Sequence, residues 1–293
     1  MALSAFVRLS RPATLPAPVA GVIGGALAAT GGSVPEPGKL LAAVASALCL
    51  TAASNAINQI ADLETDRINR PDRPIPAGHL TVRAGWIFTA IQSMAAFALA
   101  ACVNAPYFAC VAITLPVTAS YSLRPFRFKR LPFVAGAVIA TPRGLLLVLA
   151  GWAAGGGIGR QDAWILGAVA WLYVFGASTT KDFADVEGDR ATGCLTLPIL
   201  WGAGRAARFV APFLVVPFLA YPAAAAAGWL SGGPLAWSIL ALLLAGLGAA
   251  AARLLLRDPT GPLDGSPHPA WGLMYLQLTA SHAGAAVVLA LAA

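Results

Sequence analysis

The sequence predicts an all-α polytopic membrane protein, a pseudo-duplicated bundle of nine transmembrane helices. Three observations support this fold class. The 293 residues are 58% hydrophobic and only 11% charged, with a mean hydropathy of +0.75, whereas soluble domains carry roughly 25% charged residues. The apolar residues fall into runs about as long as a bilayer is thick. The acidic residues between these runs gather in two similar clusters.

Nine apolar runs are candidates for membrane spans, because a hydrocarbon core about 30 Å thick takes about 20 apolar residues per helix. They lie at residues 13–31, 39–61, 84–103, 106–122, 132–153, 163–180, 206–228, 234–252 and 270–292. The first run lacks a clear small-residue cleavage site, so we interpret it as a span and not as a cleavable signal peptide. We therefore treat residues 1–293 as one transmembrane domain surrounded by membrane lipid.

The loop charges predict how the chain is oriented. If the N-terminus is cytoplasmic, the loops on that side collect nearly all basic residues, and the opposite side receives only Lys39 and Arg160. This asymmetry follows the positive-inside rule. We therefore expect an integral protein of the inner, cytoplasmic membrane with a cytoplasmic N-terminus. Because this orientation explains the net charge of +7, we expect no nucleic acid partner.

The first polar cluster, residues 58–78, begins where the second apolar run ends. On a helix, Asn58, Asp62 and Asp66 would lie at steps of four, on one face. Neighbouring carboxylates repel each other unless a cation lies between them, and a hard divalent cation with oxygen ligands is the usual solution. Guanidinium groups suited to an anion follow directly, from Arg67, Arg70 and Arg73. The cluster therefore predicts a metal site beside an anion site.

The second polar cluster, residues 181–190, follows the sixth run and repeats this pattern. It pairs Asp185 with Asp189 as the first cluster pairs Asp62 with Asp66. Together the two clusters hold two thirds of all acidic residues, and the predicted topology places both on one face of the membrane. The simplest arrangement is a duplicated helical bundle with two acidic helix ends facing one cavity, whose active site opens to the cytoplasmic side.

Two facing aspartate clusters suit magnesium and a phosphorylated substrate. Mg²⁺ takes few protein carboxylates and completes its shell with water and substrate phosphates, so a diphosphate is the natural third partner. Arginine side chains would complete a cage around that anion. Apolar helices would enclose the space behind it, so the expected substrate has a diphosphate head and a hydrocarbon tail. If the tail is allylic, departure of the diphosphate leaves a carbocation.

One basic residue, Arg143, lies inside the fifth apolar run, between Pro142 and Gly144. A charge near the middle of a membrane is costly and usually faces a cavity or a partner. Arg143 is therefore a candidate substrate-binding residue, with a structural ion pair or snorkelling as the alternative. The neighbouring proline and glycine predict a kinked helix at this point.

Four stretches carry a resemblance to a known family. They are Asn58-x3-Asp62-x3-Asp66, Arg70-Pro-Asp-Arg-Pro-Ile-Pro-Ala-Gly78, Lys181-Asp-x2-Asp-x-Glu-Gly-Asp189 and Leu-Thr-Leu-Pro-Ile-Leu-Trp-Gly202. Together they strongly resemble the UbiA superfamily of intramembrane prenyltransferases, over essentially the whole chain. The resemblance implies nine helices around a central cavity and Mg²⁺ bound by both aspartate motifs. It also implies transfer of a prenyl group from an isoprenyl diphosphate to a lipophilic or aromatic acceptor, with release of diphosphate.

The resemblance also implies roles for individual residues. The implied metal ligands are Asp62, Asp66, Asp182, Asp185 and Asp189. The implied catalytic set is Asp62, Asp66, Asp185, Asp189 and Tyr121. Substrate contacts are expected from Asn58, Arg11, Arg67, Arg70, Arg73 and Lys181, together with Arg143.

The sequence leaves the identities of the acceptor and the donor open. The run Glu187-Gly-Asp-Arg190 and the run beginning at Arg143 are similar to the branch of chlorophyll synthases, homogentisate prenyltransferases and digeranylgeranylglyceryl phosphate synthases. The acceptor is then a tetrapyrrole acid, an aromatic ring or a glycerol phosphate.

Two other functions share parts of the pattern. An acceptor-free terpene cyclase of the same superfamily uses the same ionisation and traps the cation internally. A membrane transporter for an anionic substrate also combines duplicated helices with charged breaks. A transporter is expected to bury its coupling acids more deeply, whereas here the acids lie at the ends of spans.

Overall fold

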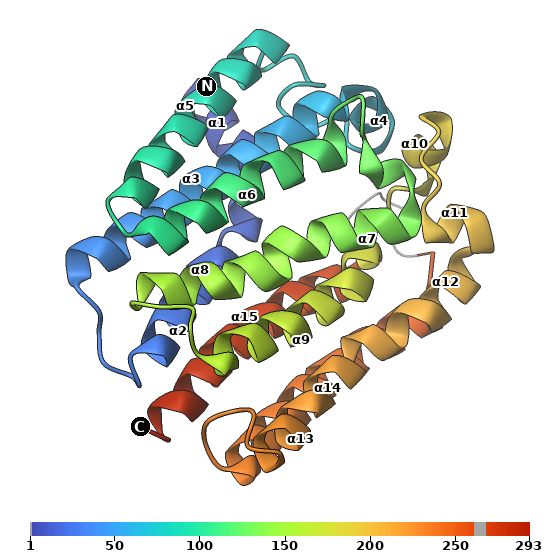
Figure 1. Ribbon diagram of the computed structural model, residues 1–293. Helices are drawn as coiled ribbons and strands as arrows, with labels where there is room; N and C mark the ends of the chain where they lie inside the picture. The colour runs from blue at the N-terminus through green and yellow to red at the C-terminus, as the bar shows by residue number, and fades with distance from the viewer. Residues whose placement is uncertain (1, 261–267) are drawn as a thin grey trace.

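The computed structural model describes residues 2–260 and 268–293, and within these ranges every regular element is helical (Figure 1). The long helices are α2 (Pro16–Ala29), α3 (Pro37–Ala61), α5 (Val82–Ala101), α6 (Ala105–Ser122), α9 (Gln161–Ala177), α14 (Pro234–Arg257) and α15 (Pro269–Ala290). The short helices are α1 (Ala2–Ser10), α4 (Leu63–Asn69), α7 (Pro132–Ala140), α8 (Leu147–Ala154), α10 (Val186–Ala191), α11 (Leu197–Trp201), α12 (Ala203–Val210) and α13 (Ala220–Ala226). Single turns connect some of them: η1 (Pro12–Thr14), η2 (Phe128–Arg130), η3 (Thr141–Leu146), η4 (Ser178–Lys181), η5 (Ala211–Leu214) and η6 (Val216–Leu219).

Each of the nine predicted apolar runs coincides with helical structure, but the count of nine spans is not confirmed. Among the described residues, seven helices are long and apolar enough to cross a membrane, and eight if the pair Leu3–Thr14 and Pro16–Ala29, which meets at 56°, forms one span. Helix α6, the fourth predicted run, is not among them. It contains Pro116 and the hydroxyl residues Thr114 and Thr118, which lower its mean hydropathy; both threonines line an internal cavity.

The helix boundaries follow from local chemistry. Proline occupies the first turn of α2, α3, α14 and α15, where its missing N–H breaks no hydrogen bond. Thr81 caps α5 by accepting a hydrogen bond from the Ala84 N–H at 3.1 Å. Asn104 caps α6 in the same way, from the Tyr107 N–H at 2.9 Å. These caps satisfy backbone donors that the first helical turn leaves unpaired.

Glycines allow α2 to pack tightly between α8 and α15. A Cβ atom added to Gly25 would lie 2.7 Å from the Gly151 Cα atom, and one added to Gly24 would lie 2.7 Å from the His282 carbonyl oxygen. Small residues at such contacts let the backbones of membrane helices approach closely, where dispersion replaces the absent hydrophobic driving force. This packing places α2, α8 and α15 around the same internal space.

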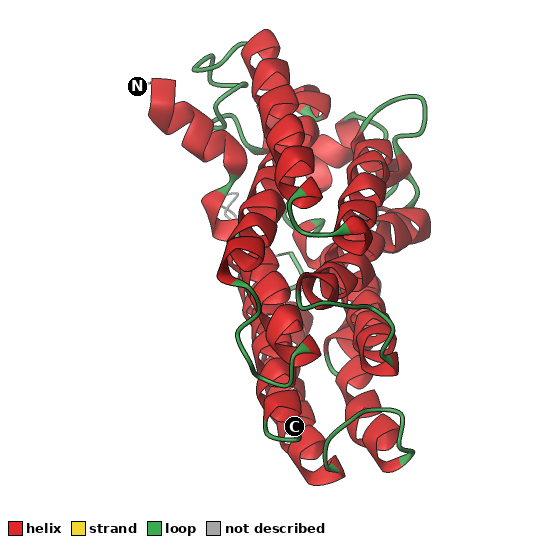
Figure 2. Cartoon of the chain, turned by 60° about the vertical axis from the view of Figure 1, so that its left-hand side comes forward, coloured by secondary structure: helices red, strands yellow, loops and turns green. Residues whose placement is uncertain are grey.

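The two acidic clusters lie together at one end of the bundle, at α4 and α10, and the C-terminus lies at the opposite end (Figure 1). Figure 2 shows the N-terminus and the C-terminus toward opposite ends of the bundle. Each cluster follows the same order of elements, a long helix, a short break and a short helix, as the duplication predicts. Helix α3 stops at Ala61 and does not continue through the first cluster. Backbone hydrogen bonds from Asp62 N to Asn58 O at 2.9 Å and from Asp66 N to Asp62 O at 2.7 Å nevertheless keep the predicted spacing.

Candidate active site

Helices α4 and α10 are fastened to each other by an asparagine. The Asn69 Nδ2 atom donates to the Asp185 carbonyl oxygen at 2.9 Å, and the Asn69 Oδ1 atom accepts from the Gly188 N–H at 2.9 Å. The hydroxyl oxygens of Thr65 and Thr192 lie 2.9 Å apart beside this contact. These bonds bring the two acidic clusters, which are more than a hundred residues apart in the sequence, to one site.

A polar cavity of about 140 Å³ lies between the two clusters. Every aspartate predicted as a metal ligand lines it: Asp62, Asp66, Asp182, Asp185 and Asp189. Five basic residues line the same cavity: Arg11, Arg70, Arg73, Lys129 and Lys181. Acids for a cation and bases for an anion therefore share one space, as the sequence predicts.

Asp62 and Asp66 of the first cluster are buried and paired with basic side chains. Both carboxylate oxygens of Asp66 accept hydrogen bonds from Arg73 Nη1 at 2.6 Å. Asp62 is ion-paired with Lys129, which reaches it from the turn that follows α6. The other oxygen of Asp62 accepts a hydrogen bond from Asn58 Nδ2 at 2.7 Å. Each carboxylate is thus neutralised within the protein.

The second cluster is satisfied less completely. Arg70 Nη2 lies 3.1 Å from Asp185 Oδ1, yet this oxygen is buried and, among the residues that the structure describes, has no partner with hydrogen-bond geometry. Lys181 Nζ lies 3.8 Å from Asp182 Oδ1 and donates a shorter hydrogen bond, 2.6 Å, to the Tyr121 hydroxyl. A further donor or a cation would therefore improve the surroundings of the Asp182 and Asp185 carboxylates.

Burial of these acids makes their ionisation costly. Burial raises the pKa of Asp182 to about 7. The charge of Lys181 opposes this shift, whereas the nearby charges of Asp189 and Asp185 add to it. Burial likewise raises the pKa of Asp189 to about 6. Burial also raises the pKa of Asp66, although the Arg73 guanidinium opposes this shift. The cavity therefore favours added positive charge next to these groups.

The carboxylates present suit Mg²⁺ in kind, though their arrangement is not that of a complete ligand shell. Within residues 2–260 and 268–293, no three His, Cys, Asp or Glu side chains stand close enough together to hold a metal ion by themselves. Instead, Arg73 and Lys129 are paired with Asp66 and Asp62, and Arg70 lies 3.1 Å from Asp185. Mg²⁺ accepts a few carboxylates and takes its other ligands from phosphate and water. A diphosphate that arrives with the metal would supply those ligands and also an anion for the basic side chains, so the residues fit Mg²⁺ bound together with a diphosphate.

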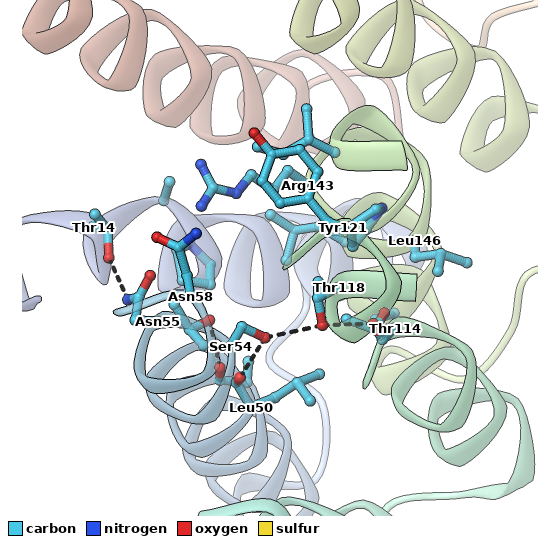
Figure 3. A pocket seen from close by; sticks show the side chains of 18 of the residues that line it. Thr14, Leu50, Ser54, Asn55, Asn58, Thr114, Thr118, Tyr121, Arg143 and Leu146 are labelled. Atoms are coloured by element: carbon cyan, nitrogen blue, oxygen red, sulfur yellow. Dashed lines mark hydrogen bonds between the residues drawn. The ribbon is translucent and has the colours of Figure 1, made fainter. Parts of the chain in front are cut away.

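A second cavity, of about 160 Å³, adjoins the polar one and extends into the bundle. Five residues line both: Arg11, Asn58, Tyr121, Lys181 and Trp271. Helices α2, α3, α6, α8 and α15 enclose the second cavity, mainly with apolar side chains. In Figure 3, Arg143 and Tyr121 lie near the centre of the view, Asn58 and Thr118 lie lower on either side, and Ser54 and Leu50 lie below these. We refer to this second space as the apolar cavity.

Hydroxyl groups line the apolar cavity without making it strongly polar. Ser54 Oγ donates to the Leu50 carbonyl oxygen at 2.9 Å, and Thr118 Oγ1 donates to the Thr114 carbonyl oxygen at 2.9 Å. Thr51 Oγ1 does the same with the Ala47 carbonyl oxygen at 2.8 Å. Because such side chains use their protons within their own helices, they leave no hydroxyl proton for an occupant. The wall suits a hydrocarbon.

Arg143 lies in π-helical turn η3 and lines the apolar cavity, but not the polar one. Its Nη1 atom donates a hydrogen bond to the Tyr275 hydroxyl at 2.8 Å. This position matches the prediction that Arg143 faces a cavity. The predicted kink takes the form of the π turn, and residues Pro132–Ala154 still form one candidate span.

The structure brings most of the predicted site residues together. Besides the five aspartates, Asn58, Arg11, Arg70, Arg73, Lys181 and Tyr121 line the polar cavity. Arg67 does not, because it points to the exposed side of α4 and lines neither cavity. Sequence reasoning missed Lys129 and Trp271. Lys129 lies in a basic loop, where it is indistinguishable from a residue that only sets orientation, and Trp271 begins an apolar helix.

Comparisons with known proteins agree with this site. The profile of the UbiA prenyltransferase family matches residues 18–264. The chain is 36% identical over 212 residues to digeranylgeranylglyceryl phosphate synthase of Methanoculleus marisnigri, covering 71% of this chain and 72% of that protein. It is 32% identical over 260 residues to the bacteriochlorophyll synthase 34 kDa chain of Chloroflexus aurantiacus, covering 86% of this chain and 81% of that protein.

A solved structure shares the fold. A UbiA homologue from Archaeoglobus fulgidus bound to GPP and Mg²⁺ superimposes with a TM-score of 0.76 at 19% identity, over 97% of this chain and 99% of that one. At this identity the agreement concerns the fold. Taken with the family profile and the sequence relatives, it leads to one conclusion. This chain belongs to the UbiA prenyltransferase family.

Proposed function

We propose that this prenyltransferase is a Mg²⁺-dependent intramembrane enzyme that ionises an isoprenyl diphosphate and transfers the prenyl group to a lipophilic or aromatic acceptor. One observation carries the proposal. A polar cavity lined by five aspartates and five basic residues opens, past Asn58 and Tyr121, into an apolar cavity inside the bundle. A molecule with a diphosphate head and a hydrocarbon tail matches both halves at once.

The diphosphate would lie among Arg70, Arg73, Lys129 and Lys181, whose charges complement its oxygens. Mg²⁺, held by Asp62, Asp66, Asp182, Asp185 and Asp189, would supply charge neutralisation for the departing diphosphate. Asn69 positions α4 against α10, so that both clusters act on one substrate. In this site the five aspartates would bind Mg²⁺, and the basic side chains would orient the diphosphate leaving group.

In the reaction, the bond between the first prenyl carbon and the diphosphate oxygen breaks, and its electron pair leaves with the diphosphate. The acceptor forms the new bond to that carbon and loses a proton. Tyr121 lies where the two cavities meet, with its hydroxyl bonded to Lys181, and its ring face can stabilise the developing allylic cation. The surrounding apolar helices exclude water, which would otherwise quench the cation.

Arg143 and Tyr275 offer a contact for the acceptor. Both line the apolar cavity outside the polar one, and they are joined by a hydrogen bond of 2.8 Å. A charge in that position is costly unless it meets a polar partner. We therefore assign Arg143 to the polar group of the acceptor and not to the diphosphate of the donor.

The orientation follows the charge distribution. Arg70, Arg73, Arg124 and Lys129 belong to the acid-bearing end, and the positive-inside rule would place this end on the cytoplasmic side. We propose that the protein lies in the cytoplasmic membrane with its active site open to the cytoplasm.

The test is a product analysis with purified protein, Mg²⁺ and prenyl diphosphates of several lengths, with and without aromatic, tetrapyrrole and glycerol phosphate acceptors, read by mass spectrometry. We expect prenylated acceptor only when Mg²⁺ is present, and none after addition of EDTA. Asp62→Ala and Asp185→Ala should each abolish turnover in a folded protein. Prenyl products formed without an acceptor would identify a cyclase, and diphosphate-independent anion flux with no product would identify a transporter.

A further inference from the structure

The apolar cavity ends at a definite level inside the bundle. The lining residue farthest from the acidic end is Val22 on α2, Ala47 on α3, Tyr107 on α6, Ala150 on α8 and Leu278 on α15. Of these five, Tyr107 has the largest side chain and the only aromatic ring. The ring of Tyr107 therefore forms a large part of the floor of the cavity.

Tyr107 is held firmly in this position. It is 1% exposed, and its hydroxyl donates a hydrogen bond of 2.6 Å to the carbonyl oxygen of Ala43 on α3. Ala43 does not line the cavity and lies one helical turn beyond Ala47. The ring thus bridges α3 and α6 below the last space that a ligand can reach. The end of a longer prenyl tail would therefore meet a fixed aromatic ring and not a mobile side chain.

The depth of the cavity follows from helix geometry. Tyr121, at the mouth, and Tyr107, at the floor, are fourteen residues apart on α6, which is about 21 Å at a rise of 1.5 Å per residue. Asn58 and Ala47 are eleven residues apart on α3, which is about 16 Å. Two independent walls therefore place the floor about 16 to 21 Å from the diphosphate site.

This depth can be expressed in isoprene units. An extended chain advances about 1.2 Å per bond, so a unit with four backbone carbons extends about 5 Å. One isoprene unit thus corresponds to about one turn of α6, whose pitch is about 5.4 Å. Three to four units fill the distance from mouth to floor.

We propose that Tyr107 sets the upper length of the prenyl donor, and that the cavity accepts tails of three to four isoprene units, C15 to C20. The inference rests on the proposed function and adds the class of donor and the residue that selects it. The position of a bulky side chain along α6 then determines the length of the accepted tail. A bulky side chain at Thr114, two turns above Tyr107 and about 10 Å below Tyr121, would shorten the accepted tail to about two units.

The experiment measures transfer from C10, C15, C20, C25 and C30 diphosphates by the purified protein. We expect Tyr107→Ala to raise the use of C25 relative to C20 by about tenfold or more, because the added carbons then find space in place of a clash. Thr114→Phe should shift the preference to C10. Tyr107→Phe keeps the ring and should keep the wild-type limit, since only the bond to Ala43 is lost.

Phe108→Ala is the matched control. It removes a neighbouring aromatic ring from the same helix, but this ring is 39% exposed and lines no part of the cavity, so the donor profile should stay unchanged. Prenyl transfer with the same length profile in wild type, Tyr107→Ala and Thr114→Phe would overturn the inference and leave the proposed function standing. Equal use of C20 and C30 by the wild type would also overturn it, since the tail would then leave between helices. Absence of transfer from every donor would instead refute the proposed function.

If Tyr107→Ala fails to fold, Thr114→Phe carries the test alone. It adds volume at a residue that lines the cavity. A donor preference unchanged from wild type in this variant is sufficient to reject the relation between position on α6 and tail length.

Discussion

The ammonium group of Lys129 is ion-paired with the carboxylate of Asp62 inside the polar cavity, although 67 residues separate them in the chain. Both side chains are buried. Lys129 comes from the turn after α6, whereas Asp62 ends α3. The first aspartate of the motif that we propose to bind Mg²⁺ is therefore neutralised by a lysine from a different part of the bundle.

Lys129→Met should destabilise the metal-free protein by about 3–5 kcal/mol, because it leaves the Asp62 carboxylate buried without its partner. Mg²⁺ should then raise the unfolding temperature more in the variant than in the wild type, since Asp62 becomes available to the metal. Thermal unfolding with and without Mg²⁺ measures both effects. Arg124→Ala, an exposed basic change in the same loop, is the control. An equal Mg²⁺ shift in Lys129→Met and the wild type would contradict the exchange of partners.

Binding of Mg²⁺ with inorganic diphosphate should tighten by about tenfold between pH 6 and pH 8. The pKa of Asp182 is raised to about 7 and that of Asp189 to about 6, mainly by burial. Metal binds the ionised carboxylates, so protons compete at pH 6 and no longer do so at pH 8. Calorimetry at both values measures the change. Asp182→Asn, titrated with the same ligand, should lose most of the dependence, and a slope equal to that of the wild type would remove Asp182 from the site.

Gly188→Ala should disturb the contact between the two acidic clusters. A Cβ atom at Gly188 would lie 2.6 Å from Asn69 Nδ2 and 2.8 Å from its Cγ and Oδ1 atoms, so Asn69 must move and loses its bonds to α10. We expect turnover to fall by about tenfold or more, as a small misplacement of binding groups suffices for such a loss. Gly204→Ala, where no atom lies within 4 Å of the new Cβ, should leave the rate unchanged. Similar activities of the two variants would show that the Asn69 contact does not position the clusters.

The three arginines of the first cluster should differ in their effect on diphosphate. Arg70→Ala and Arg73→Ala remove guanidinium groups that line the polar cavity and should each weaken Mg²⁺-dependent binding of inorganic diphosphate by about tenfold. Arg67→Ala should have little effect, since Arg67 is exposed and lines neither cavity. Arg67→Ala is thus the matched control, and a loss equal to that of Arg70→Ala would place the diphosphate outside the polar cavity.

Arg143→Leu should raise the KM for the acceptor by about tenfold or more and leave inorganic diphosphate binding unchanged. The reason is position, because Arg143 lines the apolar cavity without reaching the polar one. Tyr275→Phe removes the hydrogen bond to Arg143 and should show a weaker version of the same effect. Steady-state kinetics with each substrate varied in turn separates the two constants. Equal losses for acceptor and diphosphate would assign Arg143 to the donor.

Much of the site could be predicted because its residues carry local signals. Asn58, Asp62 and Asp66 stand at helical spacing in a chain with few charges, so their alignment on one face follows from the sequence. Hydropathy alone located nine helical segments, because the bilayer fixes how long an apolar helix must be. It did not fix the number of spans, since α6 turns hydroxyl side chains to an internal cavity and reads as less apolar than a lipid-facing helix.

The sequence by itself determined the all-helical class and the two acidic clusters, and it predicted the chemistry of a metal with a diphosphate, because composition and spacing act over a few neighbouring residues. Only the tertiary structure decided which basic groups meet those acids. Lys129 reaches Asp62 and Arg67 turns away because α3, α4 and the turn after α6 pack at particular angles. The floor at Tyr107 was likewise decided by packing, since cavity depth depends on how the surrounding helices meet and leaves no local trace in any one of them.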